Sequence, residues 1–201
     1  MNPASALFRW LYTLEVPRDR ETGRPLQVGA IPWCRRAGGG VEVLLITSRG
    51  TGKWIVPRGW TMRFRSLARA AKKEALEEAG VRGFISREPL GFVDVGKDYR
   101  LAGTINWRLA LFALEVTDVL HRWKEAGQRE RRWFAPEEAA RLVQPPEVGA
   151  LILELAASKQ RQAGGGDEQG GAGLLLTTSA EEAEAEGGER RHHHANLGAA
   201  H

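Results

Sequence analysis

Apolar and alternating segments along the chain predict short strands. Gln27–Cys34 and Val41–Thr47 are such segments, and the Arg-Arg-Ala-Gly-Gly-Gly stretch between them is typical of a hairpin turn. Trp54–Val56 predicts another short strand, which Pro57 should end because proline has no N–H to donate to a sheet. By the same criteria we expect strands around Gly83–Val95, over Asn106–Val116 and over Arg131–Phe134, and closing helices over Pro136–Leu142 and Glu147–Ala157.

One further helix carries an unusual charge pattern. It is predicted from the N-cap Ser66 to Ala79, with Gly80 as the residue that ends it. Glu74, Glu77 and Glu78 are spaced i, i+3 and i+4, which places them on one helical face with Cβ atoms about 5–6 Å apart. Like charges at this distance destabilise a helix. The pattern has two interpretations: a divalent-cation site, or a solvated acidic face, which is the commoner explanation for such a pattern alone, so the surrounding residues must decide.

A second face of this helix, beside the glutamates, indicates close packing. Ala68, Ala71, Ala75 and Ala79 form a stripe of small residues that would let the helix backbone approach a sheet. Alanine is also the best helix former, so the stripe alone does not require such packing. It favours a position of the glutamates at a helix–sheet seam.

Composition bounds the class of protein. Apolar residues make up 42% of the 201 residues and include seven tryptophans, enough for a sizeable core. No run of about 18 apolar residues occurs, so we expect no membrane span. Residues 1–21 are interpreted as an N-terminal arm rather than a signal peptide. Cys34 is the single cysteine, which fits a reducing compartment, and we expect a cytoplasmic protein.

The charge is unevenly distributed. Residues 158–201 hold four Lys or Arg and seven Asp or Glu, a net charge of −3. The whole chain has a net charge of +4, so residues 1–157 carry +7. This Gly-, Ala- and Glu-rich tail contains no aromatic residue and is predicted to be disordered. The basic body suggests a polyanionic ligand, for which nucleic acid is an alternative. His121 is the only histidine outside the tail, and no pattern around it or Cys34 supports nucleophilic catalysis.

The segment Gly59–Val81 matches a known motif of 23 residues, GX5EX7REUXEEXGU, in which U is a bulky aliphatic residue. The matching positions are Gly59, Glu74, Glu77, Glu78, Gly80 and Val81. This segment resembles the Nudix box. The preceding LLITSRGTGKWIVPRGW, and the later order of Asn106–Val119, Trp123 and Arg129–Phe134, are similar to the diphosphoinositol-polyphosphate and diadenosine-polyphosphate hydrolase branch.

The resemblance covers Thr22–Ala157 and implies an α/β fold, the Nudix α/β/α sandwich with a mixed central sheet and a loop–helix–loop catalytic motif. It predicts three regions: the arm 1–21, a Nudix hydrolase domain 22–157 and the tail 158–201. Three positions depart from the box: Arg65 replaces its first glutamate, Lys73 its arginine and Ala75 its aliphatic residue. Lys73 keeps the charge but loses the planar fork of arginine.

The resemblance also implies a site. Glu74, Glu77 and Glu78, with the Gly59 carbonyl, would bind Mg²⁺ or Mn²⁺, and Glu74 or Glu77 would act as general base. Asp94, Asp98 and Glu130 are candidates for a base from a later loop. Predicted phosphate contacts are Arg49, Lys53, Arg58, Arg108 and Arg131.

The sequence also predicts roles for four tryptophans. Trp60 could stack on a base, although packing is favoured, and Trp54, Trp123 and Trp133 are assigned to the core.

These observations predict a metal-dependent hydrolase that cleaves a pyrophosphate linkage in a nucleoside-diphosphate-linked or inositol pyrophosphate substrate. The expected partner is a small-molecule polyphosphate, with no membrane partner and with nucleic acid disfavoured because no aromatic-basic RNA motif is present. The alternative is a non-catalytic Nudix-fold module that senses a ligand or binds a partner, which Arg65 and Lys73 favour.

Overall fold

The computed structural model describes residues 16–61, 66–99 and 103–164. In this part of the chain eight strands form one mixed sheet. The strands are β1 (Leu26–Arg35), β2 (Val41–Thr47), β3 (Trp54–Ile55), β4 (Arg58–Trp60), β5 (Val81–Ile85), β6 (Gly91–Tyr99), β7 (Gly103–Val119) and β8 (Arg131–Phe134). The helices are α2 (Leu67–Glu74), the π-helical turn η1 (Ala75–Ala79), α3 (Pro136–Leu142) and α4 (Val148–Gly164).

Two parallel strands form the middle of the sheet. β1 runs parallel to β7, with Ile31 opposite Ala113, and every other strand pair is antiparallel. The predicted hairpin is confirmed, because β1 and β2 pair with Trp33 opposite Val43. After Pro57 the segment Arg58–Trp60 forms the short strand β4, which pairs with another part of β1 and has Gly59 opposite Val28. This pairing holds Arg58–Trp60 against the sheet.

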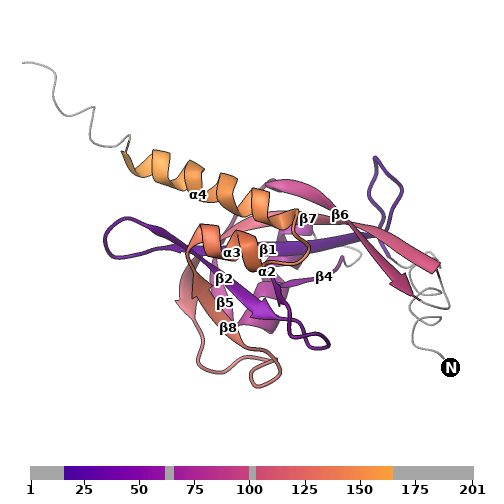
Figure 1. Ribbon diagram of the computed structural model, residues 1–201, viewed down its shortest axis with the longest axis horizontal. Coiled ribbons are helices and arrows are strands. Elements are labelled where there is room, and N and C mark those ends of the chain that lie inside the picture. The colour runs from indigo at the N-terminus through magenta and orange to yellow at the C-terminus, as the bar shows by residue number, and fades with distance from the viewer. Residues whose placement is uncertain (1–15, 62–65, 100–102, 165–201) are drawn as a thin grey trace, which may run out of the picture. The chain divides into compact units, whose positions relative to one another are not determined.

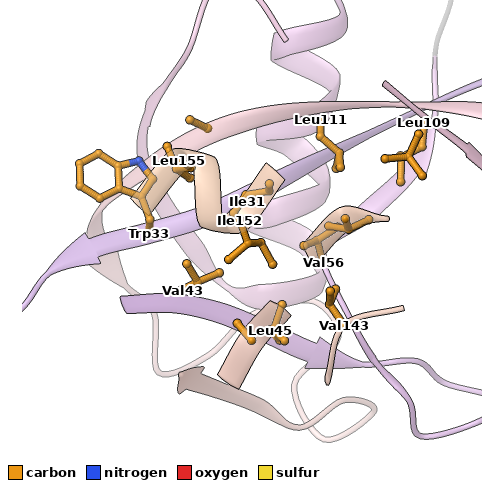
Figure 2. Packing of buried hydrophobic residues seen from close by; sticks show 14 of the residues in the cluster. Ile31, Trp33, Val43, Leu45, Val56, Leu109, Leu111, Val143, Ile152 and Leu155 are labelled. Atoms are coloured by element: carbon orange, nitrogen blue, oxygen red, sulfur yellow. The ribbon is translucent and has the colours of Figure 1, made fainter. Parts of the chain in front are cut away.

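Helices cover both faces of the sheet, as the predicted sandwich requires (Figure 1). Alternate strand residues point to opposite faces. On one face Ile31, Val43, Leu45 and Leu111 pack with residues of α3, α4 and the connections beside them (Figure 2). On the other face Val28, Leu44 and Phe112 pack against the alanines of α2 and η1.

The alanine stripe therefore has the predicted packing role. Ala71, Ala75 and Ala79 are fully buried against the sheet, and Ala70 is nearly so. Ser66 accepts the expected N-cap hydrogen bond from the Arg69 N–H. Gly80 ends the helix with φ of 64°, a left-handed conformation that favours glycine. The difference from the prediction is the last turn, which is π-helical, and a π turn of this kind often marks a functional site.

Three predicted boundaries are corrected. The single strand around Gly83–Val95 is two strands, β5 and β6, because Pro89 lacks a donor and the Ser86 hydroxyl donates to the Glu88 carbonyl in the loop between them. The central strand expected over Asn106–Val116 is longer, Gly103–Val119. The last helix does not stop at Ala157 but continues to Gly164, since Ser158–Ala163 contains no helix-breaking residue.

Several predictions concern residues outside the described ones: those on residues 1–15, on Arg65 and on the tail beyond Gly164. Among the described helices, none combines the length and apolar character that crossing a bilayer would need.

Candidate active site

A pocket of about 640 Å³ forms where α2 and η1 meet β4 and the connection between β7 and β8. We call it the acidic pocket. It brings together all four predicted metal-binding residues and two of the predicted phosphate contacts. They are Gly59, Glu74, Glu77, Glu78, Arg49 and Arg58. Four further charged residues also line it: Lys73, Lys124, Glu125 and Arg129.

Glu74 lies directly over Gly59. A Cβ atom built on Gly59 would come within 2.4 Å of the Glu74 carboxyl carbon, which is closer than real Cβ atoms approach any such group. Glycine at this position is therefore what admits the Glu74 carboxylate to the rim of β4. Burial raises the pKa of Glu74. The positive charge of Lys73 lowers this pKa, and the negative charge of Glu77 raises it.

This contact gives a first prediction. Gly59→Ala should displace the Glu74 carboxylate and reduce kcat about 100-fold, because a misplacement of about 1 Å at a catalytic group can cost that much. The free energy of unfolding should change little, since the strained contact lies at a pocket rim where Glu74 can turn away. Steady-state kinetics and urea denaturation of the variant test both statements. An alanine variant with wild-type kcat would contradict the importance of this contact.

Glu77 is held by two lysines. Lys73 Nζ lies 2.7 Å from its Oε1 and Lys124 Nζ lies 2.9 Å from its Oε2. The hydrogen bonds from Lys73 and Lys124 lower the pKa of Glu77, so the carboxylate is ionised at neutral pH. Lys73, the residue that replaces the arginine of the box, thus pairs with an acidic group of the same helix.

Glu78 is buried in a network that reaches the connection after β7. Its Oε2 accepts a hydrogen bond of 2.9 Å from the Arg58 backbone N–H, and its Oε1 pairs with the Arg129 guanidinium. Arg129 also donates to Glu125 Oε2 at 2.6 Å and to the Thr47 carbonyl at 2.9 Å. Burial raises the pKa of Glu78 to about 7, against the Arg58 hydrogen bond and the Arg129 charge, which lower it.

The backbone of η1 is fixed by the same connection. Trp123 Nε1–H donates to the Glu78 carbonyl at 3.1 Å, and the Glu125 N–H donates to the Glu77 carbonyl at 3.2 Å. A helix end leaves carbonyl groups without intrahelical partners, and these donors satisfy two carbonyls of the acidic turn. The position of Glu77 and Glu78 therefore depends on residues about 45 positions later in the chain.

The donor set suits a hard divalent cation, because Mg²⁺ prefers carboxylate, carbonyl and water oxygens. Within residues 16–61, 66–99 and 103–164, however, no group of three His, Cys, Asp or Glu side chains is already placed around one metal position. Each carboxylate has its own neighbours. Glu74 lies over Gly59, Glu77 pairs with two lysines, and Glu78 pairs with Arg129. Metal binding would require Glu77 to exchange at least one lysine contact.

The later-loop carboxylate at the pocket is Glu125, which was not among the candidates. Its side chain is mostly buried and accepts a hydrogen bond from Arg129 Nε–H. One of its carboxylate oxygens also lies 3.6 Å from Arg49 Nη1. Asp94 is instead exposed and pairs with Arg24 at 2.9 Å, and Glu130 is exposed and outside the acidic pocket. The Asp98 side chain lies outside the described residues. No sequence motif marks Glu125, because residues 120–130 form no helix and its pairing with Arg129 depends on how this connection folds.

Three predicted phosphate contacts do not line the acidic pocket: Lys53, which lines an adjoining pocket, Arg108 and Arg131. Arg108 binds Asp19 Oδ1 at 2.8 Å and Glu21 Oε2 at 2.6 Å, and its guanidinium lies 4.4 Å from the Phe92 ring centre. Burial acts to raise the pKa of Asp19, but hydrogen bonds from Thr22 and Arg108 lower it to about 2. Arg131 donates to the carbonyls of Ala79 and Leu120. Both arginines hold parts of the fold together.

The tryptophans divide between packing and the site. Trp54 packs edge-on against Phe134, with ring centres 4.9 Å apart, and Trp133 packs on the α2 face, as the core assignment predicts. Trp123 is not in the core: its ring lies 4.0 Å from the Arg131 guanidinium, beside Gly80. Trp60 lines the acidic pocket and packs against the core with its ring centre 6.0 Å from that of Trp107.

The fold and the pocket together define a small α/β/α protein that carries a glutamate-rich helix on one face of a mixed sheet. A family model described as the NUDIX domain matches residues 23–153, well over half of the chain. The chain belongs to this family, which confirms the resemblance found in the sequence.

Relatives and solved structures agree with this assignment. The chain is 35% identical over 108 residues to Nudix hydrolase 12 of Arabidopsis thaliana, covering 51% of this chain and 52% of that protein. It is 34% identical over 114 residues to a human diphosphoinositol polyphosphate phosphohydrolase, covering 55% and 59%. The match thus spans little more than half the length of these curated relatives. The structure of the dihydroneopterin triphosphate pyrophosphohydrolase of E. coli superposes with a TM-score of 0.51 at 15% identity, covering 67% of this chain and 97% of that one, a likeness of fold alone.

Proposed function

We propose that this protein is a divalent-metal-dependent hydrolase that cleaves a pyrophosphate linkage in a small-molecule polyphosphate. One observation carries the proposal: the acidic pocket gathers four glutamates and the Gly59 backbone beside the cations Arg49, Arg58, Lys73, Lys124 and Arg129. Carboxylates suit the metal, and guanidinium and ammonium groups suit phosphate oxygens.

Glu74, Glu77 and Glu78, with the Gly59 carbonyl, are the proposed ligands of Mg²⁺ or Mn²⁺. The metal would neutralise the clustered charge of the pyrophosphate and lower the pKa of a bound water. Arg49 and Arg58 would orient the phosphates, with Lys53 just beyond them. Glu74 and Glu77 are the proposed general bases within the box, and Glu125 replaces Asp94 and Glu130 as the candidate from a later loop.

The substrate belongs to the polyphosphates that the resembled branch cleaves. The human relative is named for diphosphoinositol polyphosphates, and it shares 34% identity with this chain over the matched region. We therefore place diphosphoinositol polyphosphates and diadenosine polyphosphates first among the candidate substrates. The charge of +7 on residues 1–157 suits such densely charged molecules.

A second function is favoured by a specific observation. Glu77 is neutralised by Lys73 and Lys124, and the three carboxylates do not surround one point. A module that binds a polyphosphate without cleaving it would tolerate this arrangement. The presence of all three box glutamates favours hydrolysis, because a pocket that only binds anions gains nothing from additional negative charge.

The deciding experiment is a substrate panel with the purified chain. Diadenosine polyphosphates, diphosphoinositols, ADP-ribose, NADH and sugar nucleotides are compared with Mg²⁺, with Mn²⁺ and with EDTA. We expect hydrolysis of at least one polyphosphate, lost in EDTA and restored by added metal. Tight binding of one compound without turnover of any would support the non-catalytic module instead.

A further inference from the structure

A second pocket, of about 340 Å³, adjoins the acidic pocket. We call it the distal pocket. Both pockets are lined by Ser48, Ile55 and Arg58, so one elongated ligand can occupy them together. The far end of the distal pocket is formed by Lys53, by Val95 and Trp107 of the paired strands β6 and β7, and by Gln144 before α4.

The distal pocket differs from the acidic pocket in its chemistry. Its lining contains two cationic side chains, Lys53 and Arg58, and none of the described residues that form it is acidic. Ser48, Thr51 and Gln144 add neutral hydrogen-bonding groups. Such a lining attracts an anion and, unlike the acidic pocket, supplies no carboxylate to hold a metal.

The buried polar atoms without a hydrogen-bond partner belong to residues that line these two pockets. Across the described part of the chain, three buried side-chain polar atoms have no hydrogen-bond partner: Gln27 Oε1, Arg58 Nη1 and Trp107 Nε1. Gln27 belongs to the acidic pocket, Trp107 to the distal pocket and Arg58 to both. A buried donor without an acceptor is costly and rare in native proteins. Two such donors belong to residues that line one pocket, where an entering acceptor would satisfy them.

Trp107 is the more specific of the two donors. Its side chain is only 8% exposed, and its ring is fixed beside Trp60. The indole N–H can only donate, so it selects an acceptor such as a phosphate oxygen. Arg58 is held by its backbone N–H on Glu78, which leaves the guanidinium as a separate group for a ligand.

From these contacts we infer that the distal pocket binds a further phosphoryl group of the substrate, beyond the two joined by the cleaved bond. Trp107 Nε1–H, the Arg58 guanidinium and Lys53 are the groups that bind it. The inference rests on the proposed function only in placing the cleaved bond in the acidic pocket. It selects substrates with at least three phosphoryl groups over those with two, such as ADP-ribose, NADH and sugar nucleotides.

The first test measures binding without catalysis. Inorganic tripolyphosphate is titrated into the full chain in EDTA by calorimetry. Trp107→Phe keeps an aromatic ring and removes the N–H, and Arg58→Met keeps the backbone N–H that binds Glu78. We expect each variant to weaken binding about tenfold or more, because hydrogen bonds to charged groups are among the stronger ones. Arg132→Met, an exposed arginine outside both pockets, is the matched control and should bind as the unchanged chain does.

Near-ultraviolet circular dichroism and thermal melting identify any variant that fails to fold. If Trp107→Phe is not folded, Arg58→Met decides the outcome. Wild-type affinity in the folded variants, or no binding of tripolyphosphate to the unchanged chain, would overturn the inference.

The second test uses hydrolysis. Trp107→Phe should raise KM about tenfold for a diadenosine polyphosphate or a diphosphoinositol, whichever the chain cleaves, and leave KM for ADP-ribose unchanged. The two polyphosphates show whether a nucleotide or an inositol carries the bound group. An equal rise for ADP-ribose would contradict the inference. If tripolyphosphate binding depends on Trp107 and Arg58 but no compound is hydrolysed, the phosphoryl site in the distal pocket is supported and the proposed hydrolysis is contradicted.

Discussion

Replacement of Arg129 by methionine is expected to lower the free energy of unfolding by about 3–5 kcal/mol, the cost of breaking a buried ion pair by removing one partner. The Arg129 side chain is 5% exposed, and its partners Glu78 and Glu125 are 8% and 13% exposed. Methionine fills similar space but leaves Glu78 without its cation and leaves Glu125 with only the more distant Arg49, at 3.6 Å. The Thr47 carbonyl also loses its donor. Urea denaturation in EDTA measures the change.

The control for this variant is Arg132→Met. Arg132 pairs with Glu138 at 3.2 Å, but both side chains are about half exposed, at 56% and 44%. An exposed pair of this kind contributes about 0–1 kcal/mol because water screens the charges. If Arg129→Met costs no more than Arg132→Met, Arg129 does not hold the acidic turn.

The largest effect on activity is expected for Glu77→Gln, a loss of about 1,000-fold in kcat. Metal-assisted charge stabilisation contributes several kcal/mol to a transition state, and each 1.36 kcal/mol corresponds to a tenfold change in rate. Steady-state kinetics at saturating Mg²⁺ on the substrate found by the panel measures the loss. Glu77 is a better position for this test than Glu78, because its substitution should disturb the fold less. Its side chain is partly exposed, and its contacts are two lysines on the pocket rim.

Stability should hardly change in this variant, since partly exposed ion pairs contribute about 0–1 kcal/mol. Glu138→Gln on α3, outside both pockets, makes the same chemical change and should keep full activity. Turnover by Glu77→Gln at the rate of the unchanged chain, together with an active Glu78→Gln, would exclude the proposed metal site.

The sequence predicted those parts of the fold that depend on neighbours along the chain. The β1–β2 hairpin follows from two alternating segments around a glycine-rich turn, and α2 follows from its cap, its alanines and Gly80. The proposed metal ligands follow from the resemblance of Gly59–Val81 to the Nudix box, which has fixed spacing. The strand break at Pro89 was visible in the sequence, but the apolar pattern on both sides suggested one strand.

The contacts made between distant segments were not predictable in this way. Charge alone does not tell whether an arginine meets a ligand, a carboxylate or a backbone carbonyl. Arg108 meets Asp19 and Arg131 meets the end of η1 because of how β7 and β8 are placed in the sheet. Glu125 and Arg129 reach the glutamates only because the connection after β7 folds back over η1.

The length of α4 has a practical consequence for anyone who shortens this protein. Lys159 lies in the last part of this helix, with its Nζ 5.0 Å from the centre of the Trp33 ring, and its carbonyl accepts a hydrogen bond of 3.0 Å from Arg35. A version cut after Ala157, where the sequence suggests that the tail begins, would remove this cover from the β1–β2 end of the core. A crystallisable fragment should therefore retain the chain through Gly164.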